Sequence, residues 1–194
     1  MIISTIRILN QIIHGYISPP KINIHNKTIN INFRCWPIDI DSFLHMNNSK
    51  YLHTAELSRW RTVGPILPRF WTKGVVFLIA ENRIQYLKPI KPFEKYVISS
   101  SVSVDEKDDK WIYYTHIFEE HPDDLQTRIV QKENDRGQMK EVDKKIFAKI
   151  QMKSVVKETN GKTIKPSELM DQSKYFRDWV TITRQREGEN NEQE

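Results

Sequence analysis

The chain has 194 residues, of which 38% are hydrophobic and 28% charged, and its formal net charge is +5. This length allows one well-buried domain and is short for two. The single cysteine, Cys35, excludes an internal disulfide and a multi-cysteine metal site, so we expect it to pack as a small apolar side chain. The basic charge suits an anionic partner. No zinc-finger, helix-turn-helix or aromatic–basic motif accompanies it, so no nucleic-acid partner is expected.

Residues 1–18 contain no acidic side chain, and their large apolar residues fall at helical spacing: Ile2, Ile6, Leu9, Ile13 and Tyr16. This spacing predicts an amphipathic helix. The segment is too interrupted for a transmembrane span, and it lacks the charged start and cleavage site of a secretory signal. Two interpretations stay open: a helix packed on the domain, or a membrane-interface anchor or organelle-targeting segment. The protein is therefore expected to be cytoplasmic or peripherally membrane-associated, with organelle targeting as a further option.

Residues 47–65 predict a mostly buried helix. Asn47 or Asn48 can cap its start, because the side-chain oxygen can accept a hydrogen bond from a first-turn amide. Apolar residues spread around most of its circumference: Tyr51, Leu52, Ala55, Leu57, Trp60 and Val63. Gly64 and Pro65 end it, since glycine permits a left-handed cap and proline cannot continue the turn. Amide groups at the start of such a helix can point at a substrate oxygen.

On either side of this helix the sequence alternates with period two, which is typical of strands. The expected strands lie within residues 22–24, 29–35, 75–87, 96–104, 111–118 and 144–156. Links of hairpin length make the sheet antiparallel, so the predicted fold class is α+β. The highly charged residues 119–143 predict a solvated loop. The domain plan is an N-terminal amphipathic segment (1–20), one domain (21–165), and a C-terminal helix with a polar tail (166–194).

One string, D-x-D-x-x-x-H-M-N-N-x-x-Y followed seven residues later by arginine, runs from Asp39 to Arg59. It resembles the signature of hotdog-fold thioesterases of the 4-hydroxybenzoyl-CoA thioesterase type, and is closest to the subgroup called thioesterase superfamily member six. The resemblance extends over roughly residues 33–180. It implies a hotdog fold, in which an antiparallel sheet wraps a central helix. It also implies an acyl-CoA substrate, no cofactor, and a homodimer or higher homo-oligomer with active sites at the subunit interface.

The resemblance also assigns roles within this string. The second aspartate of the pair is the family's catalytic carboxylate and matches Asp41, as nucleophile or general base. The amide at Asn48 would face the thioester oxygen. His45 is either a loop histidine bonded to the backbone or a residue that orients Asp41 or the acyl group. Asn47 is expected to cap or brace the loop and Tyr51 to join the core with its hydroxyl held by a polar partner, with substrate contact open to both.

The other charged residues carry weaker expectations. Spacing alone favours Asp41 as a turn residue, and only the motif reverses that; Asp39 is expected to be structural or solvated. Arg83, Lys88 and Lys91 are candidates for the phosphates of coenzyme A, the alternative being a solvated positive face. Glu56 and Arg59 are expected to pair along the helix. No metal site is expected, because His45 and His53 stand apart without further ligands.

The sequence therefore predicts an acyl-CoA thioesterase that releases a carboxylic acid and free coenzyme A. One alternative is a non-catalytic acyl-ligand-binding or scaffold protein with the same fold. A second is the hydratase-like branch of the hotdog fold, which usually places an Asp/His pair in a different motif context. The length of the acyl chain depends on packing that the sequence does not reveal.

Overall fold

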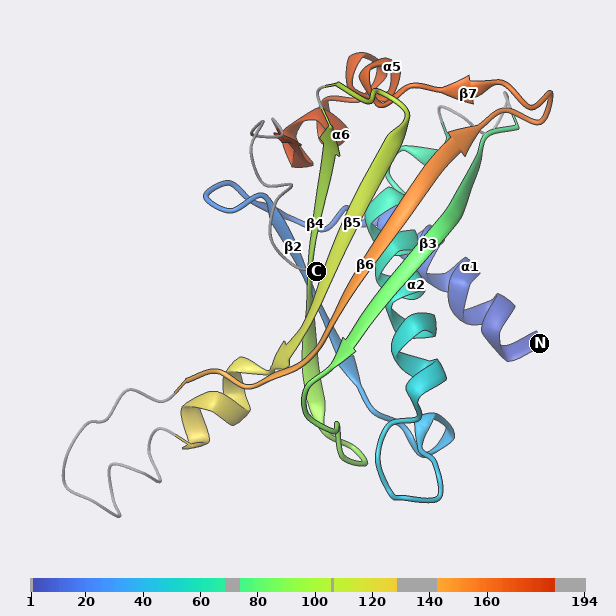
Figure 1. Ribbon diagram of the computed structural model, residues 1–194. Coiled ribbons are helices and arrows are strands. Elements are labelled where there is room, and N and C mark those ends of the chain that lie inside the picture. Colours follow the sequence, from blue (N-terminus) through green and yellow to red (C-terminus); the bar gives the residue numbers. More distant parts are fainter. Residues whose placement is uncertain (1, 69–73, 106, 129–142, 184–194) are drawn as a thin grey trace, which may run out of the picture.

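The computed structural model describes residues 2–68, 74–105, 107–128 and 143–183. A curled sheet wraps around the central helix α2 (Asn48–Val63), as Figure 1 shows. Along the sheet the strands follow the order β1 (Ile22–Asn23), β2 (Thr28–Arg34), β4 (Lys95–Asp105), β5 (Trp111–Glu120), β6 (Ile146–Lys157) and β3 (Val76–Tyr86). Each neighbouring pair on this path is antiparallel. The predicted α+β class, with a sheet wrapped around a helix, is confirmed.

Helix α2 begins and ends at the predicted residues, but its end differs in detail. Asn47 is the N-cap, and its side-chain oxygen accepts the amide of Ser49 at 2.9 Å. Gly64 has φ −45°, a right-handed conformation, so the predicted left-handed cap is wrong. The helix stops here because Pro65 has no N–H to donate and its ring does not fit a continuing turn.

What requires a glycine at position 64 is the N-terminal helix α1 (Ile2–Ile17), which packs against α2. A Cβ atom on Gly15 would stand 2.2 Å from the carbonyl oxygen of Arg61, and one on Gly64 would stand 2.8 Å from that of Ile12. The two helices therefore cross at a backbone-to-backbone contact that side chains would prevent. This contact shows that α1 packs on the domain, the first of its two interpretations.

Polar groups link α2 to the sheet beneath it. The hydroxyls of Ser58 and Ser100 lie 2.9 Å apart, and Ser100 Oγ lies 2.8 Å from Nδ1 of His116. Burial, and secondly the charge of Arg59, lower the pKa of His116 to about 3, so this imidazole is neutral at neutral pH. Arg59 itself pairs with Glu56 at 2.8 Å, as predicted.

The C-terminal part is more elaborate than the predicted helix and tail. After β7 (Thr163–Ile164) come two short helices, α5 (Pro166–Gln172) and α6 (Lys174–Trp179), and then strand β8 (Val180–Thr183). Strand β8 pairs with β4 in parallel, beyond the stretch of β4 that pairs with β2. In the predicted loop 119–143, residues 119 and 120 belong to the end of β5, and residues 122–128 form a short helix. The rest of that loop, residues 129–142, and the tail from residue 184 lie outside the described residues.

Candidate active site

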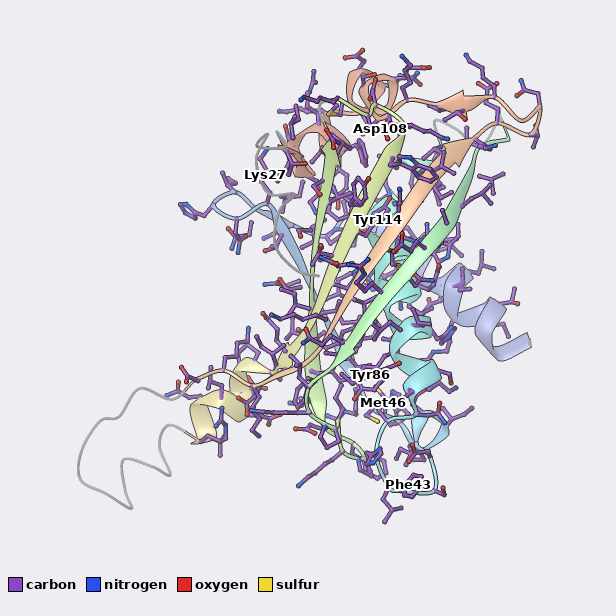
Figure 2. The ribbon with its side chains drawn as sticks, in the orientation of Figure 1. Lys27, Phe43, Met46, Tyr86, Asp108 and Tyr114 are labelled. Carbon is purple, nitrogen blue, oxygen red and sulfur yellow. The ribbon has the colours of Figure 1, made fainter. Side chains whose placement is uncertain are left out.

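The segment before α2 folds into a compact loop. A one-turn 3-10 helix, η1 (Pro37–Asp39), leads to an isolated bridge between Ile40 and Met46. Inside that bridge the amide of Asp41 donates to the carbonyl of His45 at 3.0 Å. Leu44 takes φ +60°, the left-handed region that residues with a Cβ rarely adopt, so the chain reverses tightly. Figure 2 shows Phe43 at the tip of this loop, below Met46 and Tyr86.

Asp41 has one engaged and one open carboxylate oxygen. Its Oδ1 accepts the amide of Phe43 at 2.9 Å, and Nδ1 of His45 lies 3.6 Å from the same oxygen, longer than a hydrogen bond. Within the described part of the chain, Oδ2 has no hydrogen-bond donor. The Asp41 side chain is 21% exposed and that of His45 is 41% exposed. Asp41 is thus the turn residue expected from spacing, yet it still presents a carboxylate oxygen to solvent or substrate.

The first turn of α2 leaves one amide unused. The amide of Ser49 is taken by the Asn47 side chain and that of Lys50 by the Asn47 carbonyl, at 2.9 and 2.8 Å. The N–H of Asn48 finds no acceptor among the described residues. It lies at the positive end of a 16-residue helix, where the macrodipole and a free donor both favour a negatively charged oxygen. The Tyr86 hydroxyl fixes the same residue by donating to the Asn48 carbonyl at 3.1 Å.

Tyr51 braces the start of the helix from inside. It is buried, its ring meets that of Tyr86 edge-on at 5.2 Å, and its hydroxyl oxygen accepts the amide of Ile90 at 3.3 Å. Burial raises the pKa of Tyr51 to about 12, so the phenol is protonated at neutral pH. Tyr51 is therefore a core residue with a polar partner, as predicted. Its substrate contact remains a prediction.

Asp39 has the structural role that the sequence offered as one alternative. Its side chain is 2% exposed, and Oδ1 accepts from Arg7 at 3.1 Å and lies 3.7 Å from Nζ of Lys50. Its Oδ2 accepts the amide of Trp36 at 3.2 Å, and its carbonyl accepts the amide of Asn47 at 2.9 Å. Asp39 thus ties η1 to the N-cap of α2. Sequence reasoning missed Arg7, because it lies 32 residues away on α1 and no local pattern marks it.

The three predicted phosphate contacts do not lie together. Lys88 and Lys91 are exposed on the loop whose Ile90 carbonyl accepts the amide of Met46, so they share the Asp41 end of the molecule. Arg83 pairs in register with the exposed Gln151 and lines a pocket with Tyr113 on the outer face of the sheet, opposite α2. The binding roles of all three residues remain predictions. Because Arg83 lies on the outer face of the sheet, a phosphate that it binds would lie apart from one held by Lys88 and Lys91.

The described residues around Asp41 give little support to a cysteine nucleophile or to a metal site. Burial, followed by the charges of Asp39 and Glu94, raises the pKa of the Cys35 thiol to about 11. A thiol with that pKa is a poor nucleophile at neutral pH. In the described ranges, no three His, Cys, Asp or Glu side chains are grouped so as to hold a metal ion.

Comparisons with known proteins agree with this architecture. A probable thioesterase of Saccharomyces cerevisiae is 32% identical over 80 residues, which is 40% of this chain and 34% of that protein. The alignment therefore spans about a third of the relative's length. Among solved structures, the YbaW probable thioesterase of Escherichia coli superposes with a TM-score of 0.58 at 14% identity, covering 76% of this chain and 97% of that one.

Two further structures have substrates in their names. A 1,4-dihydroxy-2-naphthoyl-CoA thioesterase from Synechocystis gives a TM-score of 0.55 at 9% identity, covering 75% of this chain and 93% of that one. An Asp-to-Asn mutant of 4-hydroxybenzoyl-CoA thioesterase, complexed with 4-hydroxybenzoyl-CoA, gives 0.56 at 12% identity, covering 75% and 97%. At these identities they show the hotdog fold. The family model of the thioesterase-like superfamily matches residues 35–164, and this chain therefore belongs to the thioesterase-like superfamily.

Proposed function

We propose that the protein hydrolyses acyl-CoA thioesters to a carboxylic acid and free coenzyme A. The observation that carries the proposal is the free N–H of Asn48 at the start of α2, in the same loop-and-helix unit as the open carboxylate oxygen of Asp41. One group can stabilise negative charge on the thioester oxygen, and the other can supply the nucleophile or the base. The family match supports this activity.

The residues suggest a sequence of steps. The Asn48 amide and the α2 dipole polarise the carbonyl as charge develops on its oxygen. Asp41 either attacks the carbonyl carbon, giving an anhydride that water then hydrolyses, or takes a proton from the attacking water. In both cases the carbon–sulfur bond breaks and the coenzyme A thiolate leaves and gains a proton. His45 is proposed as a positioning residue that orients the Asp41 carboxylate, and its Nδ1 lies 3.6 Å from Oδ1, so the contact must shorten when substrate binds.

A hydrolysis assay tests the proposal directly. Short, medium, long and aromatic acyl-CoA substrates are each incubated with the protein, and the released thiol is measured. We expect turnover of at least one class without added metal or cofactor. Binding of acyl-CoA without any thiol release would instead favour the non-catalytic acyl-ligand-binding alternative. The motif from Asp39 to Arg59 remains the basis for proposing the 4-hydroxybenzoyl-CoA thioesterase type and the member-six subgroup.

We propose that two copies pair along β3. This strand ends the sheet: β6 covers one side, and no strand in the described chain covers the other. Unpaired strand edges favour association, and β3 also exposes the large apolar side chains Val76 and Leu78.

Replacing Leu78 by Glu should disrupt this dimer, because a two-fold interface would bring the two new charges together. Light scattering at micromolar concentration should show a dimeric mass for the unmodified chain and half that mass for Leu78→Glu. Ile182→Glu, at an apolar residue on β8 that is 56% exposed against 44% for Leu78, is the control and should remain dimeric. A monomeric unmodified chain would contradict the proposal.

We propose that the outer face of α1 contacts an anionic membrane surface. None of the helices in the described residues is long and apolar enough to span a bilayer. The face of α1 turned away from α2 nevertheless exposes a row of large apolar side chains: Ile6, Leu9, Ile13, Tyr16 and Ile17. Residues 1–38 contain Arg and Lys but no acidic residue, which suits an anionic surface.

Sedimentation with lipid vesicles tests this contact. The full chain should bind vesicles containing phosphatidylserine more strongly than neutral phosphatidylcholine vesicles, and added salt should weaken the binding. Replacing both Leu9 and Ile13 by Glu removes two apolar side chains and should lower binding about tenfold or more. Ile182→Glu should have no effect. Equal binding by the double variant would exclude α1 as the contact.

A further inference from the structure

A pocket of about 510 Å³ lies between α1 and β2. One residue of α2, the first residue of β4 and the residue that follows β5 also line it. This volume falls within the range of small-molecule sites. Its walls on α1 and β2 belong to the part of the chain before residue 35, where the superfamily match begins.

The lining of the pocket is positively charged. It includes the cations Arg7, Arg34 and Lys95, together with His121, and no carboxylate. Arg7 and Lys95 each have a carboxylate partner outside the lining. Arg34 donates only to the carbonyl oxygen of Phe93, at 3.4 Å, and has no carboxylate partner among the described residues. A guanidinium with donors to spare, facing a carboxylate-free pocket, favours an anion such as a phosphate.

The same pocket offers partners for a planar, hydrogen-bonding group. Trp36 is 51% exposed, and the guanidinium carbon of Arg34 lies 5.9 Å from the centre of its ring. Gln11, also in the lining, has a buried Oε1 that accepts no hydrogen bond in the described structure. A buried acceptor without a donor is unfavourable, and because this oxygen is closed to solvent, a ligand amino group reaches it only when the Gln11 side chain turns toward the pocket. Aromatic stacking beside an arginine is a common way to hold a nucleobase.

We infer that this pocket binds an adenine nucleotide, with phosphate at Arg34 and the base against Trp36. The identity of this nucleotide rests on the proposed function: it is the nucleotide end of coenzyme A. Trp36 belongs to the same loop as Asp41, and the Trp36 amide is held by Asp39. A nucleotide bound here would leave the extended pantetheine arm free to run toward the start of α2.

Calorimetric titration of the full chain with 3′,5′-ADP tests the pocket without any hydrolysis. Loss of one charge-assisted contact in Arg34→Gln should weaken nucleotide binding about tenfold or more. Trp36→Leu should weaken 3′,5′-ADP binding while leaving the weaker binding of inorganic phosphate unchanged. Arg177→Gln, at an exposed arginine on α6 away from the pocket, is the matched control and should bind like the unmodified chain.

A kinetic comparison separates this inference from the proposed function. Arg34→Gln should raise KM for acyl-CoA and leave kcat, and both constants for the matching acyl-pantetheine, close to unchanged. If Arg34→Gln changes neither nucleotide binding nor the KM for acyl-CoA, the inferred nucleotide site is wrong and the hydrolase proposal is unaffected. Nucleotide binding weakened by Arg34→Gln in a protein that hydrolyses no acyl-CoA would support the pocket and refute the proposed function.

Discussion

Replacing Asp41 by Asn should lower kcat for acyl-CoA hydrolysis by about 10² to 10⁴-fold, the range typical of losing a general base. Asparagine keeps an oxygen that can accept the Phe43 amide, so the loop should retain its shape. It cannot take a proton or attack the carbonyl carbon effectively. Substrate affinity should change little, because the Asn48 amide and the pocket remain. The measurement is steady-state kinetics, with thermal unfolding to verify the fold.

His45→Ala provides the companion measurement. The imidazole lies 3.6 Å from Asp41, longer than a hydrogen bond, and its proposed role is to orient the carboxylate rather than to react. Its loss should reduce kcat by less than the loss of Asp41 does. An equal reduction would move His45 into the catalytic pair. Near-normal hydrolysis by Asp41→Asn would refute the mechanism.

Local patterns were sufficient for most of the fold. The alternating residues predicted strands 22–24, 29–35 and 111–118 close to where β1, β2 and β5 lie, because one face of each strand packs on the core. The cap at Asn47 followed from side-chain chemistry within two residues. Each of these features depends on near neighbours in the chain, which is where sequence patterns are informative.

Contacts between distant segments were not predictable in this way. Nothing local shows that Gly15 and Gly64 meet, so the local pattern alone indicates a left-handed cap at the glycine that ends α2. The parallel pairing of β8 with β4 likewise joins residues that lie far apart in the chain. In each case the decisive partner lies on another element.

Part of the candidate site was likewise predictable from the sequence, and part was not. The motif singled out Asp41 and Asn48. The structure adds what no motif contains: among the described residues, the Asn48 amide has no acceptor and one Asp41 carboxylate oxygen has no donor. It also places Arg83 on the outer face of the sheet, since alternation along β3 turns it away from α2. The basic pocket was invisible in sequence, because its three cations come from α1, β2 and β4, which lie far apart in the chain.

Asp39→Asn should lower the free energy of unfolding by roughly 2–3 kcal/mol, although the same change two residues later at Asp41 should not. The buried Asp39 carboxylate faces Arg7 and Lys50 and accepts the Trp36 amide, and asparagine would place a neutral amide among them. The cost stays below that of a fully buried ion pair because the two cations are 26% and 29% exposed and can regain water. Urea denaturation measures it.

Two comparisons decide whether the loss comes from this cluster. Glu81→Gln removes an exposed carboxylate from its pair with Arg83 and should change the free energy of unfolding by less than about 0.5 kcal/mol. Combining Asp39→Asn with Arg7→Gln should cost less than the sum of the two single changes, because each disrupts the same contact. Strict additivity would mean that Arg7 does not stabilise Asp39. In that case α1 would pack on the domain without holding the loop that carries Asp41.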